Sequence, residues 1–286
     1  MVISRPIHSQ IPPVAYFLVS AIFHYLGPAF AVLLFAHVEV LGVAWLRIAS
    51  AAIIFAFWRK PWNLFLHSDW EQRRLLFALG TVLALMNASF YIAISRLPLS
   101  TVGAIEFVGQ ILLAAIGIRN SRNLLALGFA IAGGGLLSNL QMQGKILGLA
   151  FAFANCVFFM LYIMLGHRIA QDGGNAGIDR LATSMLIAFL IISPIGFKEA
   201  TRAFLSIKLL LAGIGVGICS SVIPYITDQL AMARLPRASF ALMLSLLPAI
   251  ATVIGAVILK QFPTAIEILG ILLIMGGVAV HQPTDT

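Results

Sequence analysis

Long apolar stretches alternate with short polar segments along almost the whole chain. A helix needs about 20 mostly apolar residues to cross a bilayer, and ten stretches come near that length. They cover residues 13–36, 40–58, 75–95, 99–118, 123–140, 145–166, 180–197, 207–228, 237–259 and 264–281. Lipid offers no partner to an open sheet edge, and the alternating pattern of a membrane barrel is absent. The pattern therefore predicts an all-α membrane protein with ten transmembrane helices.

Two short patterns recur in the second half of the chain. The Arg-Leu-Pro segment at 96–98 returns at 234–236, and the Leu-Gly…Gly-Gly pattern at 127–135 returns at 269–277. These offsets predict two five-helix repeats, residues 1–142 and 143–286. An odd number of crossings inverts the second repeat, and inverted repeats hold their substrate near the midplane, between the halves. Small residues in 130–134 and at 276–277 predict close helix contacts.

Charged residues make up only 10% of the chain, which has 18 Lys and Arg against 10 Asp and Glu. The bases lie in short loops, so they indicate lipid headgroups and orientation rather than nucleic acid. With the N-terminus inside, the inner loops hold Arg5, Arg59, Lys60, Arg73, Arg74, Arg119, Arg122, Arg168, Arg180, Arg234 and Arg237. The outer loops hold Arg96, Lys145, Lys198, Arg202, Lys208 and Lys260. This excess inside predicts that both termini are cytoplasmic.

Charges inside the spans are functional suspects because a charge in lipid is costly. Arg47 and Glu106 each lie seven positions from the outer end of their span, roughly 10 Å deep at 1.5 Å per residue. Either Glu106 faces a cavity, where it meets a substrate amine or a proton, or it forms a structural pair with Arg47. The repeat alignment sets Leu244 opposite Glu106, so the site is asymmetric. Asp228 and Glu267 lie near span ends and are expected at the solvated interface.

Other polar and aromatic residues recur at helical spacing near the middle of the spans. We expect a substrate cavity lined by His24, Asn87, Tyr91, Glu106, Gln110, Asn155, Phe159, Tyr162, Tyr225 and Ser245. Each of these also has a simpler interpretation as an interhelical contact, and His24 is either a pH-sensitive or substrate-contacting group or a neutral histidine bonded to a neighbouring helix. Kinks are expected at Pro28, Pro224 and Pro248.

Several function classes are excluded by what the sequence lacks. It contains no nucleotide-binding loop, no metalloprotease or serine-hydrolase motif and no room for a nucleotide-binding domain. A phosphorylated substrate is disfavoured because Arg47 is the one deep base. Cys156 and Cys219 lie inside apolar spans without metal-ligand spacing, so we expect neither a metal, a cofactor nor a disulfide.

Three segments carry a family resemblance. Residues 43–47 (Val-Ala-Trp-Leu-Arg) resemble the arginine-bearing second helix of the drug/metabolite transporter superfamily, EamA type. Residues 104–109 (Ala-Ile-Glu-Phe-Val-Gly) resemble the fourth helix of its bacterial amino-acid exporters, the threonine/homoserine exporter group and the YddG-type aromatic exporters. Residues 235–249 are similar to the matching part of the second half. Gln110 and the Lys260-Gln261 pair depart from the family pattern, which has Pro and Gly-Glu there.

These observations predict a secondary transporter, not an enzyme, in the bacterial inner membrane. The expected activity is export of amino acids, including large apolar or aromatic ones, by alternating access. The protein is expected to work as a monomer on a small-molecule substrate. The expected partners are that substrate and the lipid bilayer, with no nucleic acid. Efflux of cationic drugs or other metabolites is the alternative within transport. From other classes, a membrane enzyme acting on lipid, a channel or a scramblase remains open.

Overall fold

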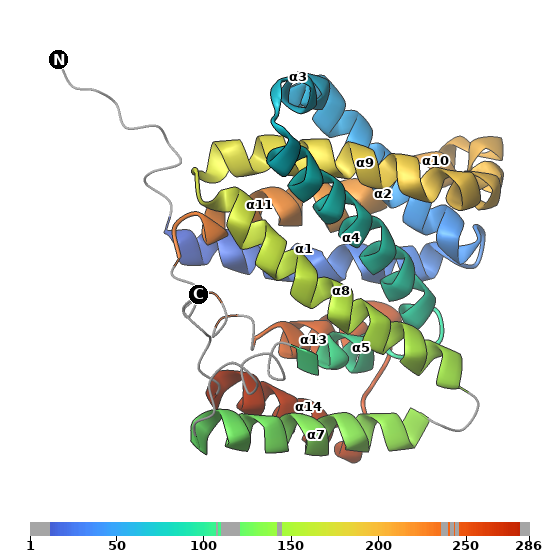
Figure 1. Ribbon diagram of the computed structural model, residues 1–286. Coiled ribbons are helices and arrows are strands. Elements are labelled where there is room, and N and C mark those ends of the chain that lie inside the picture. Colours follow the sequence, from blue (N-terminus) through green and yellow to red (C-terminus); the bar gives the residue numbers. More distant parts are fainter. Residues whose placement is uncertain are drawn as a thin grey trace.

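The computed structural model describes residues 12–106, 108–109, 121–141, 145–235, 240, 243 and 246–280, with the side chains of 138–141 left aside. Within these ranges every regular element is helical (Figure 1). The elements are α1 (Pro13–Leu34), α2 (Val40–Arg59), α3 (Pro61–His67), α4 (Trp70–Ile94), α5 (Leu99–Ile105), α7 (Ser121–Gln141), α8 (Ile146–Ala170), α9 (Gly174–Ala200), η2 (Thr201–Leu205), α10 (Ile207–Gly217), η3 (Ile218–Val222), α11 (Ile223–Met232), α13 (Leu247–Leu259) and α14 (Ala265–Val280).

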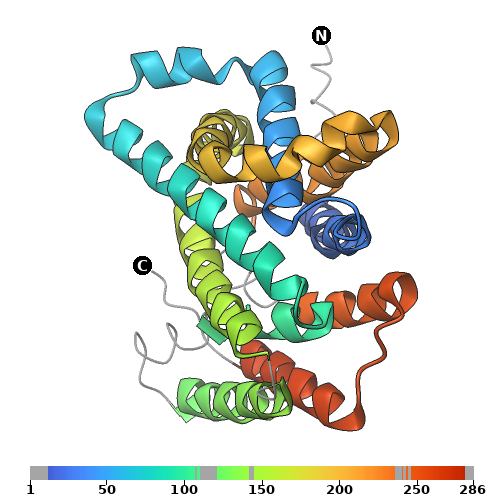
Figure 2. The same cartoon turned by 90° about the vertical axis from the view of Figure 1, so that its right-hand side faces the viewer.

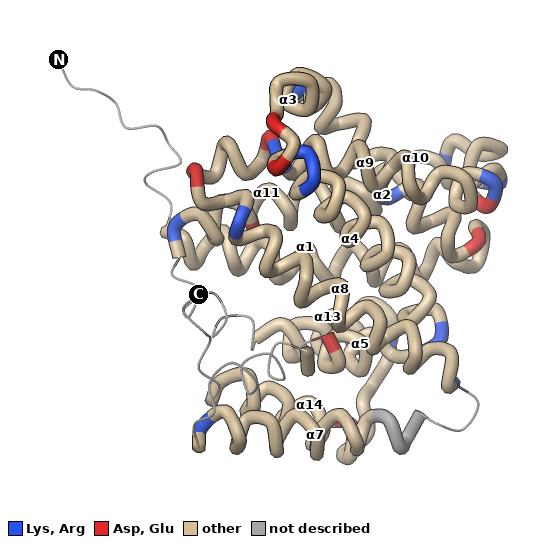
Figure 3. The backbone as a smooth tube through the Cα atoms, in the orientation of Figure 1, with Lys and Arg blue, Asp and Glu red and all other residues tan. Residues whose placement is uncertain are grey.

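Six helical stretches are long and apolar enough to cross a membrane, namely Pro13–Leu34, Val40–Arg59, Trp70–Ile94, Ile146–Ala170, Gly174–Leu205 and Ile207–Met232. Shorter apolar helices lie at Ser121–Leu137, Leu247–Leu259 and Ala265–Val280. Large apolar side chains such as Phe57, Leu190 and Val253 point outward and are more than half exposed. Charged residues gather where helices begin and end (Figure 3). An apolar belt with charged ends is what lipid requires, so this is a multi-pass membrane protein.

Helix boundaries follow the predicted spans with a few differences. The span predicted at 180–197 is longer, because α9 runs from Gly174 to Ala200. The span predicted at 207–228 is interrupted by the π-helix η3, and α11 continues it to Met232. The short helix α3 lies in a segment predicted as loop. Of the predicted fourth span, α5 is helical to Ile105 with Glu106 as its cap, and residues 108 and 109 are also helical.

The helices pack in recurring pairs. α2 lies along α9, α7 along α14, and α5 against α13. α4 crosses the bundle beside α8, while α1 packs on α11, α10 and α13. Figures 1 and 2 both show α7 and α14 side by side at one edge, with α4 and α8 adjacent. The centre is therefore enclosed mainly by α1, α2, α4, α8 and the helix formed by α10, η3 and α11.

The α7–α14 pair meets at glycines, as the small residues predicted, although not all of those named make the contact. A Cβ on Gly133 would lie 2.6 Å from the carbonyl oxygen of Gly270, so no larger residue fits without a shift. Gly134 and Gly276 have no such close neighbour, since the nearest atoms to their Cβ positions are 3.8 Å away. The close approach therefore occurs at Gly133 and Gly270, where the two backbones almost touch.

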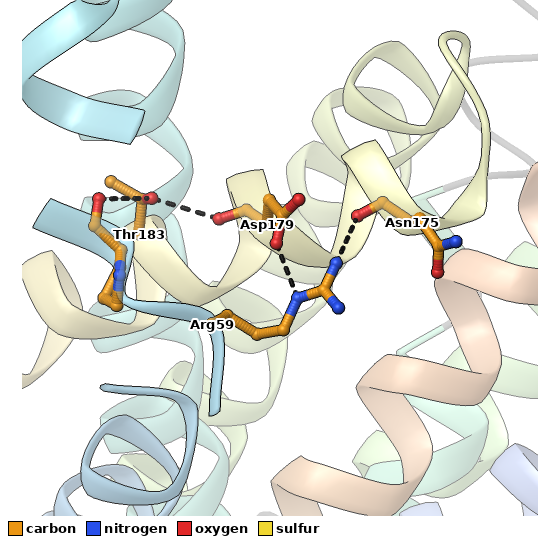
Figure 4. A network of polar contacts seen from close by, with 5 residues as sticks. Arg59, Asn175, Asp179 and Thr183 are labelled. Atoms are coloured by element: carbon orange, nitrogen blue, oxygen red, sulfur yellow. Dashed lines mark hydrogen bonds and ion pairs between the residues drawn. The ribbon is translucent and has the colours of Figure 1, made fainter. Parts of the chain in front are cut away.

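An ion-paired corner joins the end of α2 to the beginning of α9 (Figure 4). Arg59 forms a salt bridge with Asp179 and donates a 3.2 Å hydrogen bond to the carbonyl of Asn175. The Thr183 hydroxyl donates to the Asp179 carbonyl at 3.0 Å and to the Pro61 carbonyl, at the start of α3, at 3.3 Å. The Arg59 and Asp179 side chains are 20% and 39% exposed. We call these contacts the α2–α9 corner.

Candidate functional site

Arg47 is a buried cation in the middle of α2, with 3% of its surface exposed. Its Nε donates to Ser221 Oγ at 2.8 Å, and its Nη2 donates to the Ser220 carbonyl at 2.6 Å and to the Tyr225 hydroxyl at 3.3 Å. The guanidinium also lies 5.4 Å from the ring centre of Tyr91 and 5.9 Å from that of Tyr225. These contacts are neutral acceptors and aromatic faces, which stabilise a cation without neutralising it.

The local sequence explains why a carbonyl is available to Arg47. Pro224 has no amide hydrogen, so the carbonyl of Ser220 lacks its usual partner four residues later. The π-helix η3 covers the same residues and is a form often found at functional sites. Gly217, just before η3, packs against α2 so closely that a Cβ would lie 2.8 Å from the Arg47 carbonyl. Gly27 in α1 also packs closely on this segment, since a Cβ there would lie 2.7 Å from the Ser220 backbone nitrogen.

Glu106 is the buried acid of the site, with 2% of its surface exposed. Tyr25 in α1 donates to its Oε2 at 2.7 Å, and Asn155 in α8 donates to its Oε1 at 2.8 Å. No ion pair joins Glu106 to Arg47 in the part of the chain that the structure describes. The alternative of a structural Glu106–Arg47 pair is therefore wrong, because neutral groups hold each charge in its own place.

A row of rings runs between the two charges. Neighbouring ring centres are 5.3 to 6.1 Å apart along Tyr225, Tyr162, Phe159, His24 and Tyr25. These spacings are those of attractive aromatic pairs. The row begins beside Arg47 and ends at the hydrogen bond from Tyr25 to Glu106. The centre thus combines a cation, an acid and a continuous aromatic surface.

Asp228 in α11 is also buried, with 6% of its surface exposed. Ser20 donates to its Oδ1, and Tyr162 donates to its Oδ2 at 2.9 Å. The expectation of a solvated interfacial position is therefore wrong, because α11 continues to Met232 and turns Asp228 towards α1 and α8. Glu267 is likewise buried rather than solvated, and its Oε2 accepts from the Thr264 amide at 2.7 Å at the start of α14.

A small cavity lies next to Asp228. Its water-accessible volume is about 10 Å³, close to the space of one water molecule. The lining residues are Phe17, Ser20, Ala21, His24, Phe159, Ile163, Asp228, Phe240 and Leu247. Two amide oxygens of the core, Asn87 Oδ1 and Asn155 Oδ1, have no hydrogen-bond partner among the residues described. Buried polar atoms are usually satisfied, so these oxygens are available to a ligand or water.

The structure brings most of the predicted cavity residues into this core. The buried members are His24, Asn87, Tyr91, Glu106, Asn155, Phe159, Tyr162 and Tyr225. Asn87 reaches the Tyr225 hydroxyl at 3.3 Å. Gln110 and Ser245 lie outside the described residues.

The three prolines have different places. Pro28 lies inside the continuous helix α1, and Pro224 is the second residue of α11, one residue beyond the π-helix. Pro248 lies in the first turn of α13, where a proline is tolerated, so it begins that helix instead of bending its interior.

Sequence reasoning missed Tyr25, Ser20 and the Ser220–Ser221 pair. Tyr25 follows His24 directly, and the two serines come three and four residues before Pro224, so both positions gave a usable signal. No group of three or more His, Cys, Asp or Glu side chains is placed to hold a metal ion within the described ranges.

The chain is similar to a known protein family, to two exporters and to a solved structure. The model of the EamA-like transporter family matches residues 146–281. The threonine/homoserine exporter RhtA of Salmonella typhimurium is 32% identical over 254 residues, which are 88% of this chain and 84% of the exporter. RhtA of Escherichia coli (strain K12) is 32% identical over 248 residues, or 86% and 82%. One solved crystal structure aligns with 93% of this chain and 96% of its own, at a TM-score of 0.62 and 17% identity, which speaks for the fold alone.

Proposed function

Because the chain belongs to the EamA-like transporter family, we propose that it is a secondary transporter that exports amino acids across the inner membrane. Its curated relatives are exporters, so it is a transporter rather than an enzyme. The relatives named for threonine and homoserine make small hydroxylated amino acids the first substrates to test.

The observation that carries this proposal is the separation of Arg47 and Glu106 in one buried core. Each charge is held by neutral groups, and neither is neutralised by the other. A zwitterion carries one group for each: its carboxylate would bind the guanidinium, and its amine would bind the carboxylate of Glu106. The free oxygen of Asn155, whose amide nitrogen binds Glu106, would accept a further hydrogen bond from the amine.

The aromatic row supports the finer proposal that large apolar or aromatic amino acids are also substrates. His24, Phe159 and Tyr162 form the middle of that row, between the two charges. A substrate ring stacked there would gain about 1 kcal/mol beyond its burial. Threonine would use the same charges without that gain, so the two substrate classes differ in which contacts they need.

Helix pairing supports a mechanism in which two inverted five-helix repeats rock around the core. Exchanging each predicted helix with the one five places later maps the α2–α9, α7–α14 and α5–α13 pairs onto themselves. The same exchange maps the α4–α8 pair onto α11–α1. Such symmetry is what two related halves produce, and movement of one half against the other opens a central site to each side in turn.

Orientation can be tested by surface labelling. We expect both termini in the cytoplasm because of the loop charge bias. In whole cells, a cysteine replacing Lys145 should react with an impermeant thiol reagent from outside, whereas one replacing Arg122 should react only after the cells are opened. The reverse pattern would overturn the proposed orientation without affecting the proposed substrate.

The central test is counterflow in liposomes that contain the purified protein alone. Labelled threonine outside should enter liposomes preloaded with unlabelled threonine, homoserine or phenylalanine, and the rate should saturate. A cationic amine without a carboxylate should compete weakly, because it leaves Arg47 without an anion. Strong exchange of that amine with no exchange of amino acids would favour the cationic-drug alternative and refute amino-acid export.

A further inference from the structure

Asp228 is a second buried acid that the proposed substrate site does not use. Its carboxylate is held by Ser20 of α1 and Tyr162 of α8, beside a cavity with room for about one water molecule. It forms no ion pair with any lysine or arginine in the described ranges. A buried acid of this kind is expected to have a function when it lies in a membrane. We infer that Asp228 is the proton-carrying group that couples export to the proton gradient; this inference rests on the proposed function.

The hydrogen-bond partners of the two acids differ in kind. Both partners of Asp228 are hydroxyls, which can donate to a carboxylate and accept from a protonated carboxyl. Glu106 has one hydroxyl partner and the amide nitrogen of Asn155, which donates only. Each acid can keep its hydrogen bonds when protonated, because one hydroxyl partner is enough to accept from a neutral carboxyl. At Asp228 either oxygen can carry the proton, whereas at Glu106 only the oxygen that faces Tyr25 can.

The size of the adjoining space separates the two roles further. The cavity beside Asp228 admits about one water molecule, and apart from Ser20, His24 and Asp228 its lining is apolar. It has no room for an amino acid in this conformation. Water and a proton fit, and a water there can carry a proton to or from the carboxylate.

The titratable groups around Asp228 come from three helices. Tyr162 on α8 donates to it, and Tyr225 on its own helix stacks 5.4 Å from Tyr162. His24 on α1 lines the same cavity. His167 on α8 meets Phe240, another lining residue, edge to face with ring centres 5.3 Å apart. Arg47 lies on the far side of Tyr225, bound to η3.

The two acids are fastened to the same two helices, which supplies a physical route for coupling. Asp228 bonds to Ser20 of α1 and Tyr162 of α8, and Glu106 bonds to Tyr25 of α1 and Asn155 of α8. A change of charge at Asp228 alters the strength of its hydrogen bonds to α1 and α8. The same movement reaches Glu106, because both acids bridge one pair of helices.

The proton step is simple. With the core open to the outside, a hydronium ion gives its proton to an oxygen of Asp228. One O–H bond of the hydronium breaks as the carboxyl O–H bond forms, and a water molecule is left. After the halves rock, the carboxyl O–H bond breaks and the proton leaves to water on the cytoplasmic side. The amino acid moves outward in the same cycle, so the proton gradient drives export.

The experiment compares two assays on the same liposomes containing wild-type protein, Asp228→Asn, Glu106→Gln or the exposed control Asp172→Asn. The first assay is threonine counterflow at equal pH, and the second is threonine accumulation driven by an imposed pH gradient. Asp228→Asn should retain counterflow and lose gradient-driven accumulation, while Glu106→Gln should lose both. Asp172→Asn should behave as wild type, because its side chain is 65% exposed at the surface.

Each other outcome has a distinct meaning. Accumulation that persists in Asp228→Asn overturns the inference, and so does loss of counterflow in that variant with an unchanged unfolding temperature. If Asp228→Asn does not fold, Ser20→Ala keeps the acid and should shift the pH at which accumulation is half-maximal; no shift overturns the inference. Wild-type counterflow without any response to a pH gradient refutes this inference alone, whereas no wild-type counterflow of any amino acid refutes the proposed function.

Discussion

The buried core and the α2–α9 corner handle charge in opposite ways. At the corner, Arg59 and Asp179 pair directly, and both side chains reach water. In the core, Arg47 and Glu106 are almost fully buried and are held apart by hydroxyls, an amide, a carbonyl and rings. A buried pair would lock the two helices together and satisfy both charges. Separate, neutrally held charges remain available to a ligand that carries both signs.

Removing Arg47 should have the largest effect. Arg47→Gln loses the bonds to Ser220, Ser221 and Tyr225, and hydrogen bonds to a charged group contribute about 1.5–3 kcal/mol each. We expect loss of counterflow and a lower unfolding temperature in detergent. Arg47→Lys keeps the charge but not the planar fork, so it should restore little transport. Normal transport by Arg47→Gln would remove the cation from the proposed site.

Removing the charge of Glu106 should abolish transport while leaving the fold nearly unchanged. In Glu106→Gln the new carbonyl oxygen can still accept from Asn155, and the new NH2 group can donate to the Tyr25 hydroxyl, so both contacts are kept. We therefore expect lost threonine counterflow, an unfolding temperature close to wild type, and less effect on a hydroxy acid that lacks the amine. Equal loss for both substrates would argue against an amine at Glu106.

Shortening one ring of the aromatic row should change selectivity more than rate. Phe159→Ala removes the ring that stacks between His24 and Tyr162. Phenylalanine should lose affinity by about 1 kcal/mol, or roughly fivefold, relative to threonine. Competition of the two amino acids in counterflow measures this ratio. The same loss for both substrates would mean that Phe159 only packs.

Breaking the corner should have the smallest effect. Arg59→Gln or Asp179→Asn removes a partly exposed pair, which contributes about 0–1 kcal/mol. Transport should match wild type, and a double-mutant cycle on unfolding should give a coupling energy within that range. A coupling well above it, or impaired transport, would show that the corner is more than a surface ion pair.

The sequence predicted how deep each residue lies along its helix better than it predicted towards which neighbour its side chain points. α2 begins at Val40 and α5 at Leu99, as predicted, so counting placed Arg47 and Glu106 at similar depth. Whether they touch depends on helix rotation and packing, which one amphipathic pattern does not fix when both lipid and core are apolar. Among the described residues there are six long spans and three shorter apolar helices, so the ten-helix count and the inverted repeat stay predictions.

Small local features account for the other differences. Gly133 makes the close contact with Gly270, while its neighbour Gly134 does not, since one residue turns a helix by about 100°. Asp228 was placed at a span end because the apolar run stops there, yet α11 continues one turn further. Hydrogen bonds from Ser20 and Tyr162 make its burial possible. These partners lie 208 and 66 residues away along the chain, so the sequence around Asp228 does not reveal them.

The π-helix at 218–222 has a consequence for insertions and deletions. A π-turn holds one residue more than an α-turn, so the side chains after it are rotated relative to those before it. This lets one continuous helix pack Gly213 and Gly217 against α2 and then turn Asp228 towards Ser20 of α1 and Tyr162 of α8. Deleting one residue here would turn every later side chain of the helix by about 100°. A substitution would alter one side chain, so the length of this segment is a stricter requirement than its composition.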